Sequence, residues 1–328
     1  MSARPPRVLV RAPNWIGDAV LSLAALRDIR RNLPDSRIEV LARGSVKELY
    51  AAVPEVDGVR ELRGLRETAR ALAGAFDACI LLTNSFGSAL LARLAGIPER
   101  WGYATDARGA LLTRRARVPA SVRGKSEVYY YRAMLEGIGL QTFNPQDTSL
   151  RALPEWSERG RALLGDDQAR WVGLNPGAAF GTAKRWIPER YAAVAESLAR
   201  EGARIAIVGG PAERQLAQEI AAGMSAAPRV LCGETTLGEL VGVLGRMSLL
   251  VTNDSGPMHL AAAQGVPLVA IFGPTDWRET APRAERLRLV REPVYCAPCK
   301  LRECPIDHRC MRAVTVERVA QAARELLH

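Results

Sequence analysis

Residues 252–274 read Thr-Asn-Asp-Ser-Gly-Pro-Met-His-Leu-Ala-Ala-Ala-Gln-Gly-Val-Pro-Leu-Val-Ala-Ile-Phe-Gly-Pro, and this pattern predicts a strand end, a tight turn, a short helix over 258–264 and a second buried strand. Pro257 suits the start of the helix, where the N–H group that proline lacks would have no partner. The free N–H groups there favour an anion, and Asp254 and Ser255 add side-chain oxygens. We therefore expect a pyrophosphate beside a sugar hydroxyl, although an ordinary capped turn has the same pattern.

The same order of elements opens each half of the chain. A strand at 7–12 runs into a loop and a helix at 19–33, and a strand at 171–175 runs into a loop that ends where Pro188 starts a helix. Short strands alternate with helical segments through both halves, and the prolines and mixed polar residues of 139–154 are typical of a linker. The sequence therefore predicts an α/β protein of two domains, with strand-end loops lining a cleft between them.

Length and composition agree with this division. A chain of 328 residues is long for one core, and its 48% hydrophobic and 24% charged residues are ordinary values. The first ten residues lack the apolar core of a signal peptide, and no apolar run approaches membrane-spanning length. We therefore expect a cytoplasmic protein.

The formal net charge of +10 leaves three kinds of partner open: nucleic acid, an anionic membrane face or an acidic substrate. An aromatic content of 5% and scattered arginines disfavour nucleic acid. Positive charge is densest over 99–125, which carries Arg100, Arg108, Arg114, Arg115, Arg117, Arg123 and Lys125 against Glu99 and Asp106. The segment is either a solvated loop or a contact for a phosphorylated, membrane-held substrate.

Two more strand ends carry polar side chains. Asp18 falls in the first turn of the first helix, where acidic residues are common because they complement the helix dipole. Asn84 and Ser85 follow the strand at 78–82, where open α/β sheets bind ligands, or else they cap the next helix. The loop before Asp18 has one glycine where a dinucleotide fingerprint needs three, so a dehydrogenase is disfavoured.

The six cysteines are too few for a disulfide framework in a chain of this size. Cys79 and Cys232 lie at the ends of predicted buried strands, which indicates a structural role. The others gather with a histidine near the C-terminus: Cys296, Cys299, Cys304, Cys310 and His308. These side chains could surround a structural zinc ion, but their irregular spacing favours reduced, packed thiols. We therefore expect that no cofactor is required.

Four blocks of sequence carry a family resemblance in the same order along the chain: 12–18, 84–86, 176–186 and 253–259. From the first strand to the last helix, the chain resembles the bacterial ADP-heptose:lipopolysaccharide heptosyltransferases of glycosyltransferase family 9, above all their heptosyltransferase II branch. The resemblance implies a GT-B fold, in which two Rossmann-like domains face each other across a cleft. The implied divisions are an acceptor domain at 1–153, a nucleotide-sugar domain at 154–312 and a terminal helix at 313–328 that packs back on the first domain.

The resemblance also implies an activity. Members transfer a heptose from ADP-L-glycero-D-manno-heptose, with inversion, to the heptosyl-Kdo2-lipid A inner core at the inner face of the cytoplasmic membrane. The implied protein is a peripheral monomer that binds no nucleic acid. Heptosyltransferase I, a member with another acceptor, and a non-catalytic nucleotide-sugar-binding protein stay open as alternatives.

Carried over residue by residue, the resemblance makes Asp18 the catalytic base. The donor-binding positions are Thr182, Lys184, Glu213, Asp254, Ser255, Gly256, Met258 and His259, with the weakest local match at Glu213. The acceptor-binding positions are Asn14, Trp15, Asn84, Ser85, Arg114 and Arg115. Inverting transfer needs a base on the acceptor hydroxyl and a stabilised leaving group on the opposite side. A helix N-terminus and one lysine can stabilise a departing diphosphate without a metal.

Overall fold

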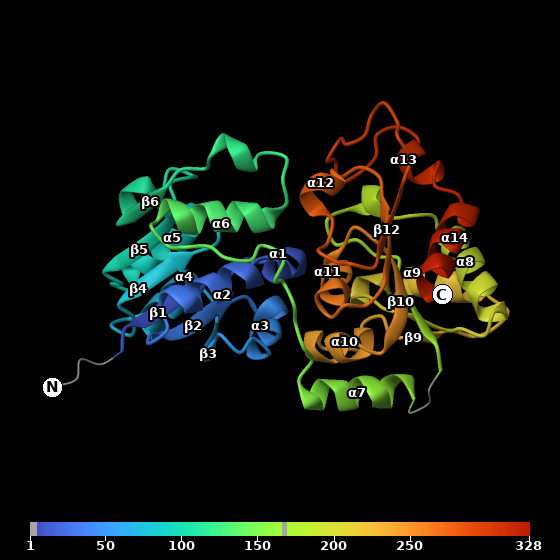
Figure 1. The fold of residues 1–328 in the computed structure, drawn as a ribbon, viewed down its shortest axis with the longest axis horizontal. Helices are drawn as coiled ribbons and strands as arrows, with labels where there is room; N and C mark the ends of the chain where they lie inside the picture. Colours follow the sequence, from blue (N-terminus) through green and yellow to red (C-terminus); the bar gives the residue numbers. More distant parts are fainter. Residues whose placement is uncertain (1–4, 166–168) are drawn as a thin grey trace. The chain divides into compact units, whose positions relative to one another are not determined.

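The computed structural model describes residues 5–165 and 169–328. The chain divides into two compact units, Met1–Thr148 (unit 1) and Ser149–His328 (unit 2) (Figure 1). The division falls before the predicted boundary at 153, because Leu150 is buried and its N–H donates to the carbonyl of Ala263 at 2.8 Å. The end of the predicted linker therefore belongs to unit 2.

Unit 1 is built on a parallel six-stranded sheet of order β3-β2-β1-β4-β5-β6. Its strands are β1 (Arg7–Arg11), β2 (Arg37–Ala42), β3 (Gly58–Glu61), β4 (Ala78–Leu81), β5 (Glu99–Tyr103) and β6 (Arg114–Ala116). Its helices are α1 (Ile16–Leu21), α2 (Leu23–Asn32), α3 (Gly44–Ala51), α4 (Leu65–Leu72), α5 (Phe86–Leu94) and α6 (Glu127–Gly137), with short 3-10 turns η1 (Gly109–Leu111) and η2 (Ala120–Val122). The helix predicted at 19–33 is broken at Ser22, whose hydroxyl donates to the carbonyl of Ala19 at 2.8 Å.

Unit 2 repeats the architecture, with a parallel six-stranded sheet of order β12-β11-β10-β7-β8-β9. Its strands are β7 (Trp171–Asn175), β8 (Arg204–Ile207), β9 (Arg229–Val230), β10 (Met247–Asn253), β11 (Leu268–Phe272) and β12 (Leu287–Arg291). Its helices are α7 (Pro154–Leu164), α8 (Pro188–Arg200), α9 (Arg214–Ala222), α10 (Leu237–Leu244), α11 (Gly256–Ala263), α12 (Trp277–Thr280), α13 (Arg309–Arg312) and α14 (Val316–Leu327), with 3-10 turns η3 (Thr182–Lys184) and η4 (Pro211–Glu213).

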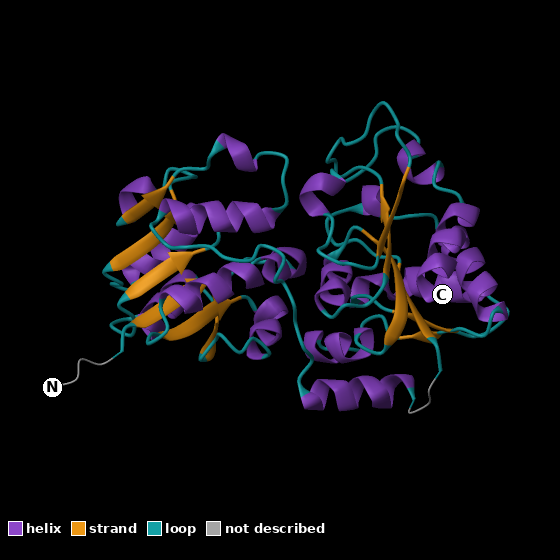
Figure 2. Cartoon of the chain, in the orientation of Figure 1, coloured by secondary structure: helices purple, strands orange, loops and turns teal. Residues whose placement is uncertain are grey.

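Each sheet carries helices on both faces (Figure 2). This explains why central strands such as β10 and β11 are buried almost throughout rather than at alternate residues. Because the strands are parallel, their carboxyl ends meet at one edge of the sheet, and the loops that leave this edge position the candidate site. In the described part of the chain, no helix is long and apolar enough to span a membrane.

The last helix belongs to unit 2. In α14, Val319, Ala323 and Leu326 are buried in the core of unit 2, where the helix packs on α8 and β12. Its strongly apolar face covers one side of the sheet of unit 2. Packing of this helix on the first domain stays a prediction.

Candidate active site

The start of α11 lies where β10 ends, beside the end of β7. The hydroxyl of Ser255 donates to Oδ1 of Asn175 at 2.5 Å and does not cap α11. The first N–H groups of this helix therefore have no side-chain cap, and the positive end of its dipole can receive an anion. The predicted turn and helix are found, with the helix at Gly256–Ala263.

Asp254 is the buried charge at the mouth of this turn. Its Oδ2 accepts hydrogen bonds from Nζ of Lys184 at 2.8 Å, from Oγ1 of Thr275 at 2.6 Å and from Oγ1 of Thr280 at 3.1 Å. The structure thus brings together the predicted Lys184 and Asp254, which are 70 residues apart in sequence. Thr275 and Thr280 were not predicted, because no motif marks the loop after β11.

The donor loop, residues 176–186, is fixed to the end of β10 by Asn253. The amide of this buried side chain donates to the carbonyl of Pro176 at 2.6 Å and accepts from the N–H of Trp186 at 3.2 Å. Both ends of the loop are therefore tied to one residue. Between them, Lys184 is half-buried and Thr182 is exposed, so both predicted residues lie on the accessible part of the loop.

Glu213 lies at the end of η4 and packs over the donor loop. Its Oε2 accepts from the N–H of Gly210 at 2.6 Å. A Cβ atom at Gly177 would lie 1.8 Å from Oε1 of Glu213, so a larger residue there would displace the Glu213 carboxylate. The structure therefore places Glu213 beside the donor loop, despite its weaker sequence match.

Met258 and His259 have different surroundings from the other donor positions. The side chain of Met258 is fully buried against Ala270 and Phe272, so only its main chain can face a ligand. His259 is 5% exposed, and its Nδ1 has no hydrogen-bond partner among the described residues. Burial lowers the pKa of His259 to about 4, against an opposing effect of Asp254. Its imidazole is therefore neutral near pH 7.

On unit 1, Asp18 lies in the first turn of α1, as predicted. Burial raises the pKa of Tyr131 and Tyr50, and the negative charge of Asp18 raises both further, so these phenols border the carboxylate and stay protonated. Arg11, which was not predicted, is 4% exposed and donates to Oδ1 of Asn14 at 2.6 Å. The sequence feature that could have indicated Arg11 is a charged residue within an otherwise apolar strand.

Trp15 and the loop after β4 present other predicted acceptor residues. Trp15 is 56% exposed at the start of α1. The amide of Asn84 donates to the hydroxyl of Tyr130 at 2.7 Å. Ser85 caps α5 by accepting from the N–H of Ser88 at 3.3 Å, which is the structural role left open in the sequence.

Arg108 contacts the loop after β4 and was not predicted as a site residue. It is fully buried and donates to the carbonyls of Thr83 and Tyr103 and to the hydroxyl of Ser88. Burial lowers its pKa. The guanidinium thus ties the loop after β4 to the loop after β5, and only the fold brings those acceptors together.

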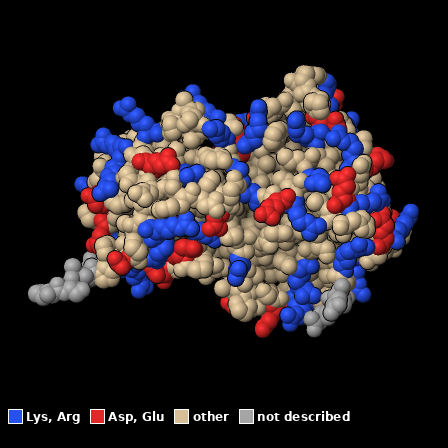
Figure 3. Space-filling model, in the orientation of Figure 1, with Lys and Arg blue, Asp and Glu red and all other residues tan. Residues whose placement is uncertain are grey.

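Arg114 and Arg115 are surface residues of the edge strand β6. The guanidinium of Arg114 lies 4.3 Å from the ring centroid of Trp101 and 4.0 Å from the carboxylate of Glu99, and Arg115 donates to the carbonyl of Leu112 at 3.4 Å. These contacts are local, and within the described residues neither arginine is hydrogen-bonded to Asn14 or Asn84. Lys and Arg side chains are also prominent on the visible surface around this edge (Figure 3).

The cysteines separate into two kinds. Cys79 and Cys232 are buried, and burial raises the pKa of each to about 12. Burial and the neighbouring thiols of the C-terminal segment raise the pKa of Cys310 to about 11. The N–H of His308 donates to Sγ of Cys304 at 3.2 Å. Within residues 5–165 and 169–328, no group of three or more His, Cys, Asp or Glu residues is arranged to hold a metal ion.

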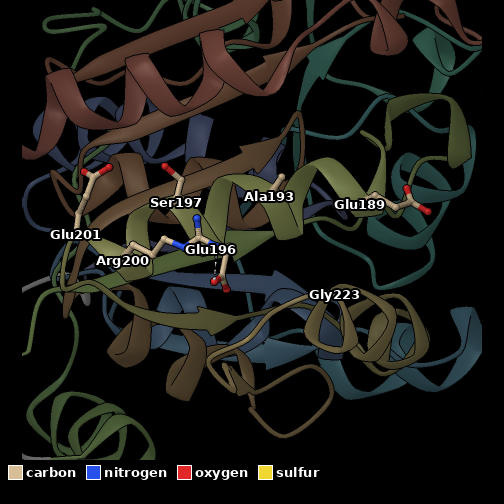
Figure 4. A pocket seen from close by; sticks show the side chains of 7 residues that line it. All are labelled: Glu189, Ala193, Glu196, Ser197, Arg200, Glu201 and Gly223. Atoms are coloured by element: carbon tan, nitrogen blue, oxygen red, sulfur yellow. Dashed lines mark ion pairs between the residues drawn. The ribbon is translucent and has the colours of Figure 1, made fainter.

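A separate hollow of about 470 Å³ lies on α8 (Figure 4). It is lined by Glu189, Ala193, Glu196, Ser197, Arg200, Glu201 and Gly223. Glu196 is paired with Arg200 at 3.3 Å and accepts from the N–H of Ser225 at 3.0 Å. No predicted site residue lines this hollow, and its central carboxylate is already satisfied by protein groups, so it is not a candidate active site.

The fold and these strand-end loops define a glycosyltransferase of GT-B type, as the solved structures of similar fold show. The structure described as ADP-heptose lps heptosyltransferase II from E. coli matches with a TM-score of 0.85, 27% identity and 98% coverage of both chains. A glycosyltransferase family 9 structure from Veillonella parvula matches with a TM-score of 0.86 and 26% identity, over 100% of this chain and 98% of that one.

The chain belongs to glycosyltransferase family 9 (heptosyltransferase), whose model matches residues 65–309. It is 31% identical to lipopolysaccharide heptosyltransferase 2 of Salmonella typhimurium, over 87% of this chain and 88% of that protein. The identity to lipopolysaccharide heptosyltransferase 2 of Escherichia coli K12 is also 31%, with the same coverage. These matches confirm the family resemblance and the α/β fold. The family model covers all the donor positions but begins after Asp18.

Proposed function

We propose that this protein transfers a heptose from ADP-L-glycero-D-manno-heptose to heptosyl-Kdo2-lipid A, with inversion, during synthesis of the lipopolysaccharide core. Family membership and similarity to proteins named lipopolysaccharide heptosyltransferase 2 support the substrate class. The single observation that carries the proposal is the ion pair of Lys184 with Asp254 at the uncapped start of α11. It combines a cation, a helix dipole and a buried carboxylate in one place.

The donor half of the reaction needs a stabilised diphosphate. In the proposed complex, the N–H groups at the start of α11 and the ammonium of Lys184 bind the phosphate oxygens. Asp254 accepts a hydrogen bond from a heptose hydroxyl, and Glu213 accepts one from the adenosine ribose. When the bond between the anomeric carbon and the diphosphate breaks, ADP keeps the electron pair, and these positive groups offset the added charge.

The acceptor half needs a proton acceptor. In the proposed mechanism, Asp18 takes the proton of the acceptor hydroxyl as that oxygen forms its bond to the anomeric carbon, opposite the departing ADP. One displacement from the opposite side inverts the configuration. Asn14, Trp15 and Asn84 would bind the acceptor sugars by hydrogen bonds and stacking.

The lipid anchor of the proposed acceptor implies work at the inner face of the cytoplasmic membrane, as a peripheral protein. Exposed basic residues around β6, among them Arg114 and Arg115, support contact with phosphorylated lipid. We propose a monomer that needs no nucleic acid and no cofactor.

The donor and the stereochemistry can be tested together. Purified protein is incubated with a heptosyl-Kdo2-lipid A acceptor and ADP-heptose, and UDP- and GDP-linked sugars serve as controls. Release of the nucleoside diphosphate is followed. The proposal expects release only from ADP-heptose, and NMR of the product should show an inverted anomeric centre. Retention of configuration, or turnover of another nucleotide sugar in preference, would refute it.

A further inference from the structure

Residues 296–310, to which the proposed function gives no role, lie against the donor loop. The N–H of Ala183 donates to the carbonyl of Arg302 at 2.9 Å, and Nε2 of His308 donates back to the carbonyl of Ala183 at 2.6 Å. A Cβ atom at Gly181 would lie 2.2 Å from the carbonyl oxygen of Arg302. The two segments are therefore in close contact at Gly181, and both the N–H and the carbonyl of Ala183 are bonded to residues 296–310.

This contact brings a second cation to the donor loop. Cζ of Arg302 lies 5.1 Å from the ring centroid of Phe180, and Nζ of Lys184 lies 5.1 Å from the same centroid. Both distances are within the range of cation–π interaction. One aromatic ring of the donor loop thus contacts both positive charges, and Lys184 in turn pairs with Asp254 beside the start of α11.

The donor site described so far has less positive charge than a bound diphosphate requires. Lys184 and Asp254 are 12% and 5% exposed and form an ion pair, so their charges cancel locally. A helix N-terminus contributes only about half a positive charge, which is less than a diphosphate requires. Arg302 is exposed, and among the described residues no carboxylate forms an ion pair with it. A guanidinium can bind two phosphate oxygens at once.

We propose that Arg302 is a second cation of the donor site, which binds the diphosphate of the nucleotide sugar and offsets the charge that ADP gains on leaving. The hydrogen bond from the N–H of Ala183 to the carbonyl of Arg302 holds this arginine beside the donor loop. The inference rests on the proposed function, because it assigns the diphosphate of that donor to this site.

Calorimetric titration of ADP and of adenosine tests the proposal on the full chain. Arg302→Ala keeps the backbone contact to Ala183 and should weaken ADP binding at least about tenfold, while adenosine binding stays unchanged. The ADP affinity of Arg302→Lys should lie between those of wild type and Arg302→Ala, because lysine keeps the charge but loses the paired N–H donors of the guanidinium. Arg200→Ala, which removes an exposed arginine of α8, is the matched control and should bind ADP as wild type does.

Each other outcome overturns the assignment. If Arg302→Ala binds ADP within about twofold of wild type, or loses adenosine affinity equally, Arg302 does not bind the diphosphate. If Lys184→Ala weakens ADP binding while Arg302→Ala does not, only this inference fails. If the wild-type protein binds no ADP, the proposed function fails with it.

Discussion

A base for a sugar hydroxyl must be ionised and must lie at an accessible strand end. Asp18 lies after β1 in the first turn of α1, where a negative charge complements the helix dipole. We expect Asp18→Asn to keep the fold and donor binding and to lose at least about a hundredfold in kcat, since general-base catalysis contributes about 10²–10⁴. Single-turnover transfer by the variant measures this. Transfer within about threefold of wild type would make Asp18 a helix-terminus residue only.

Lys184 should be required for the donor. Removing one charged contact to a phosphate costs about 1.5–3 kcal/mol, so we expect Lys184→Ala to raise the KM for ADP-heptose, or lower turnover, at least about tenfold. Steady-state kinetics would show this change. The matched control is Lys47→Ala, which removes an exposed lysine paired with Glu61 in unit 1. Equal kinetics of the two variants would remove Lys184 from the site.

At this scale the sequence indicated residues within motifs but not their partners. Lys184 and Asp254 were both predicted, since each lies in a recognisable loop. Thr275, which shares the same carboxylate oxygen, comes from a loop without a motif. Arg108 contacts carbonyls of two strand-end loops, and its burial depends on a sheet order that no local pattern shows.

Among the elements, α11 was predicted from residue types alone, with Pro257 near its start and a buried strand on each side. The prediction placed its start two residues late, because the helix already begins at Gly256. The segment 99–125 shows the opposite case, because its charges indicated a loop or a binding patch while β5 and β6 form there. Trp101 and Tyr103 are buried in that sheet, so tertiary packing decided the structure of a segment with a weak local pattern.

The buried histidine of α11 makes stability depend on pH. The pKa of His259 is lowered to about 4, whereas an exposed histidine titrates near about 6.5. Between these values the unfolded chain binds a proton that the folded chain does not. The free energy of unfolding should therefore fall as the pH falls from about 6.5 to about 4, by up to about 3 kcal/mol from this residue.

We expect His259→Gln to reduce this loss of stability between about pH 7 and about pH 5. Urea denaturation at both pH values measures it, and only the difference between them matters, so a general destabilisation does not affect the result. His328→Gln changes an exposed histidine and should leave the difference as in wild type. An unchanged difference in His259→Gln would show that His259 is accessible to protons in the folded protein.

At the scale of the molecule, two similar sheets divide the proposed labour, with the base on one and the donor site on the other. The repeated order of strand, loop and helix predicted both sheets. The division between the units falls before residue 153, because Leu150 is buried and bonded to Ala263 of unit 2. The terminal helix could not be assigned from its amphipathic pattern, because that pattern gives an apolar face but not the surface that covers it.

Exposed basic residues of unit 1 should bind the protein to anionic lipid. We expect sedimentation with vesicles that contain phosphatidylglycerol, release by salt, and weaker binding of the double variant Arg115→Glu/Arg117→Glu, since each basic residue near such a surface contributes about 1 kcal/mol. Arg200→Glu on unit 2 makes the matched control. Equal binding to neutral vesicles, or no effect of the double variant, would contradict this surface assignment.

The most direct test of the account is mass spectrometry of the products formed by the purified protein with ADP-heptose and two acceptors, Kdo2-lipid A and heptosyl-Kdo2-lipid A. The proposed function predicts that the acceptor that already carries a heptose gains one more, while Kdo2-lipid A is unchanged. Addition of heptose only to Kdo2-lipid A, or to neither acceptor, would contradict it.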